Sequence, residues 1–200
     1  LFAAGGALDV RGVLTASAAS AADAVDFIGA GAPAARMAQL EPVAVWMLAV
    51  PDDRIAPVCA ELAASHSLAG AVVFHCSGAK SSAELSAAAE AGALTASVHP
   101  IRSFADPGRV AADFAGTWCG IEGEPGALAL LEPALHAIGA RLAPIDPAAK
   151  TVYHAAAVFA SNYLVTVLDT ALRAYCAAGI PEDVARLLAR PLAAETLENV

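Results

Sequence analysis

The sequence predicts an α/β protein in which a doubly wound parallel sheet is followed by a wholly helical segment. Between residues 7 and 145, apolar runs of strand length alternate with segments of helical periodicity. Two of these runs, residues 43–50 and 71–76, are apolar throughout, as strands covered on both faces are. Beyond Asp146 and Pro147 only helical patterns follow. We therefore expect a sheet domain over residues 1–147 and the start of a helical domain over residues 148–200.

The individual elements follow from periodicity, caps and breakers. Ser17 or Ser20 is the expected N-cap of the first complete helix, and Gly5 and Gly6 read as the stop of a helix that begins upstream of Leu1. We expect the first strand of the sheet and its glycine turn to lie upstream as well. The predicted strands are residues 7–17, 43–50, 71–76, 94–100, 117–121 and 141–145. The predicted helices are residues 18–28, 33–40, 55–65, 82–91, 125–138, 148–178, 182–188 and a last one from Pro191.

Composition narrows the class of partner. The formal net charge is −9 and the pI is near 4.8, which argues against nucleic acid or an anionic membrane as a partner because both need an excess of Lys and Arg. The four cysteines are far apart and form no group with His at metal-ligand spacing, so we expect no metal site. Reduced thiols and the lack of a signal peptide at residues 1–6 favour a cytoplasmic protein.

The helix predicted over residues 148–178 is unusually apolar. Residues 151–168 carry no formal charge, a length close to a membrane span. Lys150, His154 and Ser161 nevertheless share one narrow stripe of this helix, and Asn162 and Asp169 widen it. Because the preceding sheet domain offers a place to bury the apolar face, we interpret the helix as buried in protein and not in lipid.

Three predicted strands end in distinctive polar groups. They are AVPDD (residues 49–53), HCSGA (residues 75–79) and SVHP (residues 97–100). Ligands of open parallel sheets bind beyond the carboxyl ends of the strands, where small residues let a flat cofactor approach the backbone. Each group also has a structural interpretation: His75 as a strand-end histidine, Cys76 as packing, and Asp52 or Asp53 as a helix cap.

Two registers are possible for the dinucleotide turn. Gly29, Gly31 and Ala34 have the GxGxxA spacing with Asp52 about 20 residues on, but the strand before them would be short and Pro33 would lie inside the phosphate turn. In the preferred register, residues 7–17 form the second strand. Thr15 and Ser17 then lie where the adenosine ribose or its 2′-phosphate would bind, which favours NADP over NAD.

Five segments of the chain resemble bacterial Rossmann-like proteins that carry the domain of unknown function DUF2520. In chain order they are AVPDD, HCSGA, HPIRSFADP, TWCGIEG and YHAAAVFASNYL. These proteins are relatives of the 6-phosphogluconate, 3-hydroxyisobutyrate and prephenate dehydrogenases, and the resemblance covers nearly all 200 residues. It implies a Rossmann-type NAD(P)-binding domain, an all-helical C-terminal domain that forms a homodimer, and a site in the cleft between the domains.

The resemblance also implies roles for single residues. Ser77 would lie near the nicotinamide, His99 would face the substrate, and Asn162 would match the asparagine of the KxxxN helix of the hydroxyacid dehydrogenases. Val158 stands where those enzymes have their acid–base lysine, so His154 or His99 would have to move a proton. The expected cofactor contacts are Thr15, Ser17, Val50, Pro51, Asp52, Cys76, Ser77 and Gly78.

Two functions are compatible with this pattern. The first is an oxidoreductase that transfers hydride between nicotinamide and a small hydroxy or oxo acid. The second is a non-catalytic nucleotide sensor or scaffold that keeps the fold and lacks the acid–base group.

Overall fold

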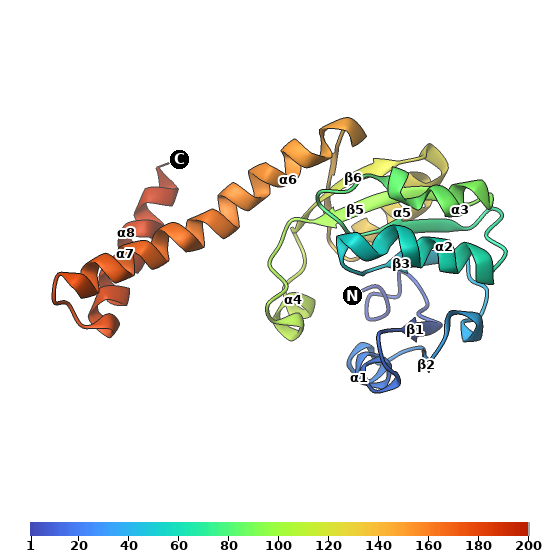
Figure 1. Ribbon diagram of the computed structural model, residues 1–200, viewed down its shortest axis with the longest axis horizontal. Helices are drawn as coiled ribbons and strands as arrows, with labels where there is room; N and C mark the ends of the chain where they lie inside the picture. The colour runs from blue at the N-terminus through green and yellow to red at the C-terminus, as the bar shows by residue number, and fades with distance from the viewer. Residues whose placement is uncertain (200) are drawn as a thin grey trace. The chain divides into compact units, whose positions relative to one another are not determined.

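The structure is a computed structural model that describes residues 1–199, and it divides into two compact units, Leu1–Tyr153 and His154–Val200. The first unit is the α/β part of the chain, and the second is wholly helical (Figure 1). The division falls six residues after Pro147. Helix α6 (Lys150–Val158) spans this division, with its first turn in the α/β unit.

The main sheet of the first unit has five strands in the order β3-β4-β5-β6-β7. The strands are β3 (Val45–Leu48), β4 (Val72–His75), β5 (Leu94–Pro100), β6 (Trp118–Gly123) and β7 (Arg141–Pro144). All neighbours are parallel except β5 and β6, which pair antiparallel with Ser97 opposite Glu122 and His99 opposite Gly120. The expectation of a doubly wound parallel sheet is confirmed for the fold class, with the difference that β6 and β7 run opposite to β3, β4 and β5. A loop with one short helix, α4 (Pro107–Ala112), joins β5 to β6 in place of the long crossover helix that parallel neighbours need.

Helices cover both faces of this sheet (Figure 1). On one face α2 (Ile55–Ser65) packs beside a 3-10 turn (Ser82–Leu85) and α3 (Ser86–Glu90), around buried side chains such as Val73. On the other face α5 (Pro125–Ala137) packs against Phe74, Val98 and Ile121. Burial on both faces explains the continuous apolar run of β4, whereas β3 buries Trp46 and Leu48 and leaves Met47 exposed.

A second, two-stranded sheet precedes the main one. Parallel strands β1 (Gly12–Leu14) and β2 (Ala32–Ala34) flank α1 (Ala18–Ile28). Ser17 caps α1 by accepting a hydrogen bond from the Ser20 N–H at 3.1 Å, as predicted, and Gly29 ends it with a φ of 74°.

The same region corrects two expectations. Gly29 is a helix C-cap and Pro33 lies in strand β2, so the Gly29–Gly31–Ala34 register for a phosphate turn is wrong. The helix predicted over residues 33–40 is also wrong: β2 is followed only by a 3-10 turn, Met37–Gln39. Proline is tolerated in β2 because its missing N–H costs nothing on the outer strand of the pair.

The second unit contains two helical segments. The first runs from α6 through a π-helical turn (Phe159–Tyr163) into α7 (Leu164–Ala177), and the second is α8 (Glu182–Glu198). Helix α8 continues through Pro191, where the sequence predicted a new helix. A proline removes one backbone hydrogen bond, but the packing of α8 on α7, which buries Ala185 and Ala189, keeps the helix intact.

The apolar helix retains its ambiguous character in the structure. The stretch Pro147–Ala177 is long and apolar enough to cross a membrane by length and composition, and none of its most apolar window is buried. Its burial in protein therefore stays a prediction.

Candidate functional site

The carboxyl ends of β3, β4 and β5 border a cavity of about 490 Å³ in the α/β unit. Its walls are mostly apolar and include Met47, Phe74, Val98 and Phe114. The polar residues that line it are Asp52, Cys76, Ser77, His99 and Arg102. Parallel strands direct their ligands to this edge, so the cavity lies where the three polar strand ends predicted a site.

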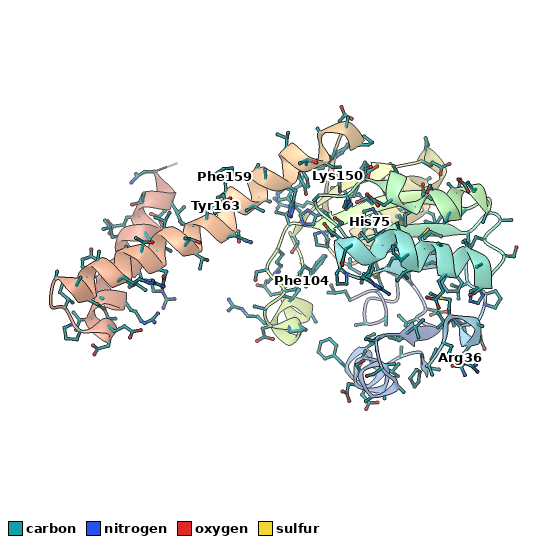
Figure 2. The ribbon with its side chains drawn as sticks, viewed as in Figure 1. Arg36, His75, Phe104, Lys150, Phe159 and Tyr163 are labelled. Atoms are coloured by element: carbon teal, nitrogen blue, oxygen red, sulfur yellow. The ribbon has the colours of Figure 1, made fainter. Side chains whose placement is uncertain are left out.

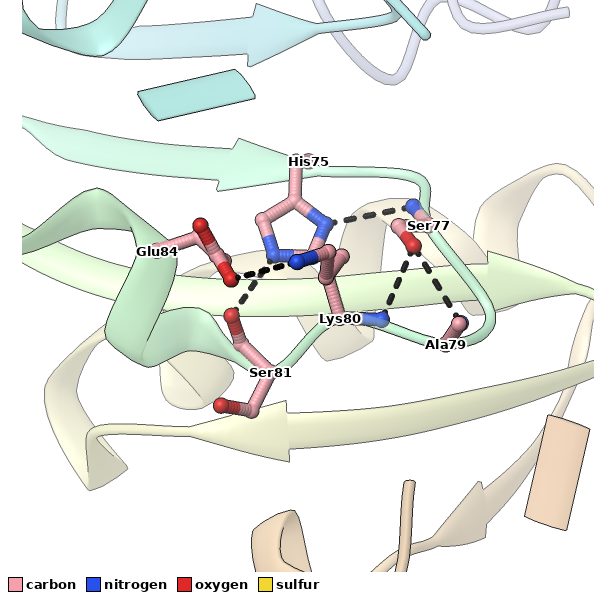
Figure 3. A network of polar contacts seen from close by, with 6 residues as sticks. All are labelled: His75, Ser77, Ala79, Lys80, Ser81 and Glu84. Carbon is pink, nitrogen blue, oxygen red and sulfur yellow. Dashed lines mark hydrogen bonds and ion pairs between the residues drawn. The ribbon is translucent and has the colours of Figure 1, made fainter. Parts of the chain in front are cut away.

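The turn after β4 is held by His75, which is fully buried (Figure 3). Its Nδ1 accepts a hydrogen bond from the Ser77 backbone N–H at 3.1 Å, and its Nε2 lies 3.0 Å from the Ser81 carbonyl oxygen. Since a carbonyl only accepts, the proton is on Nε2 and the imidazole is neutral. Burial lowers the pKa of His75, which the Ser81 hydrogen bond only partly opposes. His75 is thus the structural strand-end histidine, and it shapes the turn.

Ser77 is a buried residue of the cavity wall. Its hydroxyl oxygen accepts hydrogen bonds from the backbone N–H groups of Ala79, at 3.2 Å, and Lys80, at 2.9 Å (Figure 3). These bonds close the turn that contains the buried Gly78. Lys80 itself pairs with Glu84 at 3.0 Å, and both side chains are partly exposed.

Lys150 is a site residue to which sequence reasoning assigned no role. Its side chain is only 2% exposed, and its Nζ donates hydrogen bonds to the Ser77 carbonyl oxygen at 3.0 Å and to Ser97 Oγ at 2.8 Å (Figure 2). Burial lowers the pKa of this ammonium, and the carboxylates of Glu122 and Asp52 partly oppose the shift. Lys150 thereby fastens the first turn of α6 to the turn after β4 and to the middle of β5.

Glu122 supplies the nearest buried negative charge to this cluster. It is 3% exposed, and its two carboxylate oxygens accept hydrogen bonds from the Ser82 backbone N–H and from Ser82 Oγ, both at 2.8 Å. The only sequence signal for it was a charged residue inside a strand that is otherwise apolar. For Lys150 the signal was its place on the stripe of the apolar helix.

His99 meets an unpredicted partner, Tyr153. The Nδ1 atom of His99 lies 2.9 Å from the Tyr153 phenolic oxygen, and the two rings meet edge to face with centroids 5.6 Å apart. Glycine is required beside them: a Cβ at Gly120 would lie 2.7 Å from Tyr153 Cζ. His99 therefore lines the cavity with an imidazole whose Nδ1 is in contact with the Tyr153 hydroxyl.

The AVPDD segment lies partly at the cavity. Val50 and Asp52 line it, whereas Pro51 is the N-cap of the 3-10 turn Asp52–Arg54 that leads into α2.

Burial raises the pKa of Cys76 to about 12. Cys76 is therefore a packing residue with an unreactive thiol.

Thr15 and Ser17 do not line this cavity. The Thr15 hydroxyl donates to the Ser17 carbonyl oxygen at 2.9 Å, and the Ser17 hydroxyl caps α1. Both hydroxyls lie at the carboxyl end of β1, where the preferred register places them, but both make hydrogen bonds within the N-cap of α1.

His154 and Asn162 belong to the helical unit. Asn162 lies within the π-helical turn, which ends at Tyr163, whose ring packs edge to face on Phe159 with centroids 4.8 Å apart (Figure 2). One extra residue in a turn rotates the following residues back by about one α-helical step, ~100°. Asn162 is the fourth residue of this turn, so it is shifted only part of the way toward the angular position that Ser161 would have in an uninterrupted helix. The approach of His154 and Asn162 to Ser77 and His99 stays a prediction.

Among residues 1–199 the structure contains no group of three or more His, Cys, Asp or Glu side chains able to hold a metal ion. The polar groups described above are instead hydroxyl, imidazole, ammonium and backbone groups at strand ends. This set suits a neutral organic ring or amide.

Comparison with known proteins identifies both parts of the chain. A model of the Rossmann-like domain matches residues 5–100, and a model of the domain of unknown function DUF2520 matches residues 117–200. Among curated proteins, none matches the chain.

Solved structures share this architecture. Protein TM1727 from Thermotoga maritima is 26% identical with a TM-score of 0.68, over 94% of this chain and 71% of that one. Protein BF3122 from Bacteroides fragilis, named as a candidate NADP oxidoreductase, is 19% identical with a TM-score of 0.77, over 100% and 74%. A reductive aminase from Aspergillus terreus in complex with NADPH and ethyl levulinate is 19% identical with a TM-score of 0.70, over 98% and 68%. For the last two, the likeness concerns the fold.

Proposed function

We propose that this chain, which belongs to the Rossmann-like proteins that carry a DUF2520 domain, is an NAD(P)-dependent oxidoreductase acting on a small hydroxy or oxo acid. The observation that carries the proposal is that Ser77, which follows β4 and lines a largely apolar cavity, is held through its backbone carbonyl by the buried Lys150, which also bonds to Ser97 in the middle of β5. A buried lysine that stiffens a strand-end turn next to a cavity is costly, so a binding role explains its place.

The residues fit the nicotinamide end of a dinucleotide. Phe74, Val98 and Phe114 form apolar walls that exclude water from a flat ring, and Ser77 and His99 place polar atoms at its edge. Such a cofactor, when bound, supplies hydride to an electron-poor carbon or accepts one. The chain itself orients the ring, excludes water and binds the polar atom next to the reacting carbon.

The cofactor choice we propose is NADP. The reductive aminase of similar fold is in complex with NADPH, and Thr15 and Ser17 stand at the end of β1 where an acidic residue would favour NAD. We further propose a cytoplasmic homodimer formed through the helical unit. Exposed apolar side chains on α7 and α8, among them Val165, Val167 and Leu187, support this interface.

Binding of NADPH and NADH to the purified protein tests the proposal. A ligand at 100 times its Kd adds about 2.7 kcal/mol to the free energy of unfolding. For a chain of this length that raises Tm by roughly 5–10 °C. We expect Ser77→Ala to weaken NADPH binding, whereas Ser86→Ala on exposed α3 leaves it unchanged. No Tm shift and no change in NADPH fluorescence with either cofactor would refute the proposal.

A second function has one observation in its favour. Val158 replaces the lysine of the related dehydrogenases, so a nucleotide sensor without turnover is the alternative. Oxidation of NADPH with a panel of 2-oxo acids and cyclic imines distinguishes the two. Turnover that His99→Gln abolishes without loss of NADPH binding excludes the sensor, and binding without turnover of any member favours it.

A further inference from the structure

Two oppositely charged side chains line the cavity of the α/β unit, and they come from opposite flanks of it. Asp52 follows β3 and Arg102 follows β5, while β4 and the turn with Ser77 lie between these two strands. Among the described residues that line the cavity, Arg102 is the only lysine or arginine. Since the proposed cofactor contacts come from the ends of β3 and β4, Arg102 belongs to the flank that is left for the second reactant.

Arg102 is held by hydrogen bonds to the segment between α4 and β6. Its Nη1 donates to the Asp113 carbonyl oxygen and to Thr117 Oγ1, the latter at 3.3 Å, and its Nη2 donates to Asp113 Oδ2 at 3.2 Å. Thr117 is buried, and the Arg102 side chain is only 22% exposed. The guanidinium is thus oriented before a ligand arrives, which reduces the entropy cost of binding one.

These bonds leave one edge of the guanidinium available. The group has five N–H donors, and the hydrogen bonds among residues 1–199 use both donors of Nη1 and one of Nη2. Both nitrogens reach Asp113 from the Nη1–Nη2 end of the planar group. The two remaining donors are therefore the Nε–H and the second N–H of Nη2, and such a fork matches the two oxygens of one carboxylate.

The negative charge of Asp113 does not cancel this site. The Asp113 side chain is 75% exposed, so water and salt screen its ion pair with Arg102, which contributes little energy. The cavity itself has mostly apolar walls, among them Val98, Phe104 and Phe114. Because charges interact more strongly beside apolar walls than in water, a carboxylate inside the cavity gains more from Arg102 than Asp113 does.

We propose that Arg102 binds the carboxylate of the acid substrate through its Nε–Nη2 edge and thereby selects acids over neutral carbonyl compounds. The carboxylate then occupies the β5 flank of the cavity, and the rest of the small acid lies between Arg102 and Ser77. Arg102 is thus a specificity-determining residue that takes no part in hydride transfer. This deepens the proposed function, on which it rests for the reaction but not for the binding of the acid.

Binding of an acid can be measured without the cofactor. The full chain is titrated with pyruvate and with its neutral counterpart pyruvamide, while the ¹H–¹⁵N signal of Arg102 Nε is followed; its loss in Arg102→Lys assigns this signal. We expect pyruvate to shift the signal with a dissociation constant on the order of 1–10 mM. Pyruvamide, and sodium chloride at equal ionic strength, should leave the signal in place.

Variants test the energy of the contact through saturation transfer to the methyl protons of pyruvate. Arg102→Gln should weaken pyruvate binding by about 10- to 100-fold, because a charged pair of hydrogen bonds is lost. Arg109→Gln removes the same charge from the exposed surface of α4 and is the matched control, for which binding should be unchanged.

Three results would overturn the inference: an Arg102 signal that pyruvate does not move, an equal shift with chloride, or pyruvate binding as tight in Arg102→Gln as in the wild type. The wild-type titration decides the contact even where Arg102→Gln does not fold. The outcome is also separate from that of the cofactor test. NADPH binding without pyruvate binding refutes only the carboxylate site, and pyruvate binding without NADPH binding refutes only the proposed cofactor.

Discussion

We predict that Glu122→Gln destabilises the α/β unit by about 3 kcal/mol, because a buried charge balance is broken while the shape is kept. Glu122 is 3% exposed, accepts two hydrogen bonds of 2.8 Å from Ser82, and opposes the effect of burial on Lys150. Glutamine is of similar size and can still bond to Ser82. The perturbation therefore acts mainly on the charge.

The magnitude follows from two contributions. Hydrogen bonds to a charged group are worth roughly 1.5–3 kcal/mol each and neutral ones about 1 kcal/mol, so two bonds lose about 2 kcal/mol. Lys150 also loses the carboxylate whose charge opposes the effect of burial on its ammonium; in the part of the chain that the structure describes the two groups form no direct ion pair, so this electrostatic loss adds about 1 kcal/mol. With a shift of about 2–4 °C per kcal/mol for a chain of this length, Tm falls by roughly 6–12 °C.

A double-mutant cycle measures this effect. Urea unfolding of Glu122→Gln, Lys150→Met and the double variant should give a coupling of at least about 1 kcal/mol, with the double variant less destabilised than the sum. Glu124→Gln is the matched control: Glu124 is exposed, and its Oε1 accepts from the Thr95 N–H and hydroxyl. A cost for Glu122→Gln no larger than that of the control, or zero coupling to Lys150, would refute the reasoning.

Three further predictions rest on single residues. At pH 8 a thiol reagent should label the exposed Cys176 in a fast phase that Cys176→Ser removes. Cys76, with a pKa of about 12, is a thiolate in about one molecule in 10⁴ and should react far more slowly, and rapid labelling of Cys76 would contradict this raised pKa. Burial lowers the native pKa of Lys150, so between that pKa and about 10.4 the unfolded chain binds more protons than the folded one. Lys150 therefore makes the free energy of unfolding rise as pH rises through this window, and fall as pH falls through it. Urea titrations of wild type and Lys150→Met should show that difference in slope, and parallel curves would argue against it. Removing the α1 cap in Ser17→Ala should cost about 1 kcal/mol, visible as faster amide exchange in α1, and unchanged exchange would mean that the cap is not what holds the helix.

Elements with strong local signals could be predicted from the sequence residue by residue. Helix α2 and strand β5 have the predicted bounds, since a clear apolar period and a following Pro or polar break define each. The antiparallel orientation of β6 could not be foreseen, because strand direction depends on the path of the connecting loop and not on the pattern within the strand. The polar groups at the strand ends could be predicted as well, because each directly follows an apolar run that marks a strand.

Lys150 shows what tertiary structure adds to the site. It is one of only two lysines in the chain, and helical spacing alone placed it on the correct stripe. Nothing local indicates that its ammonium reaches Ser77 and Ser97, residues 73 and 53 positions away in the sequence. With 2% exposure and two protein acceptors, Lys150 does not replace the acid–base lysine of the related dehydrogenases. It positions the turn that would contact the cofactor.

The π-helical turn changes the position of Asn162 on the helix in a way that the sequence did not predict. A period of 3.6 residues put Ser161 on the stripe with His154 and left Asn162 about 80° away. The wider turn over Phe159–Tyr163 shifts Asn162 toward the line of His154. Single π-helical turns are frequent at functional sites, and the Asn162 side chain has both a donor and an acceptor. We therefore predict that Asn162 is the residue of this helix that binds the oxo acid.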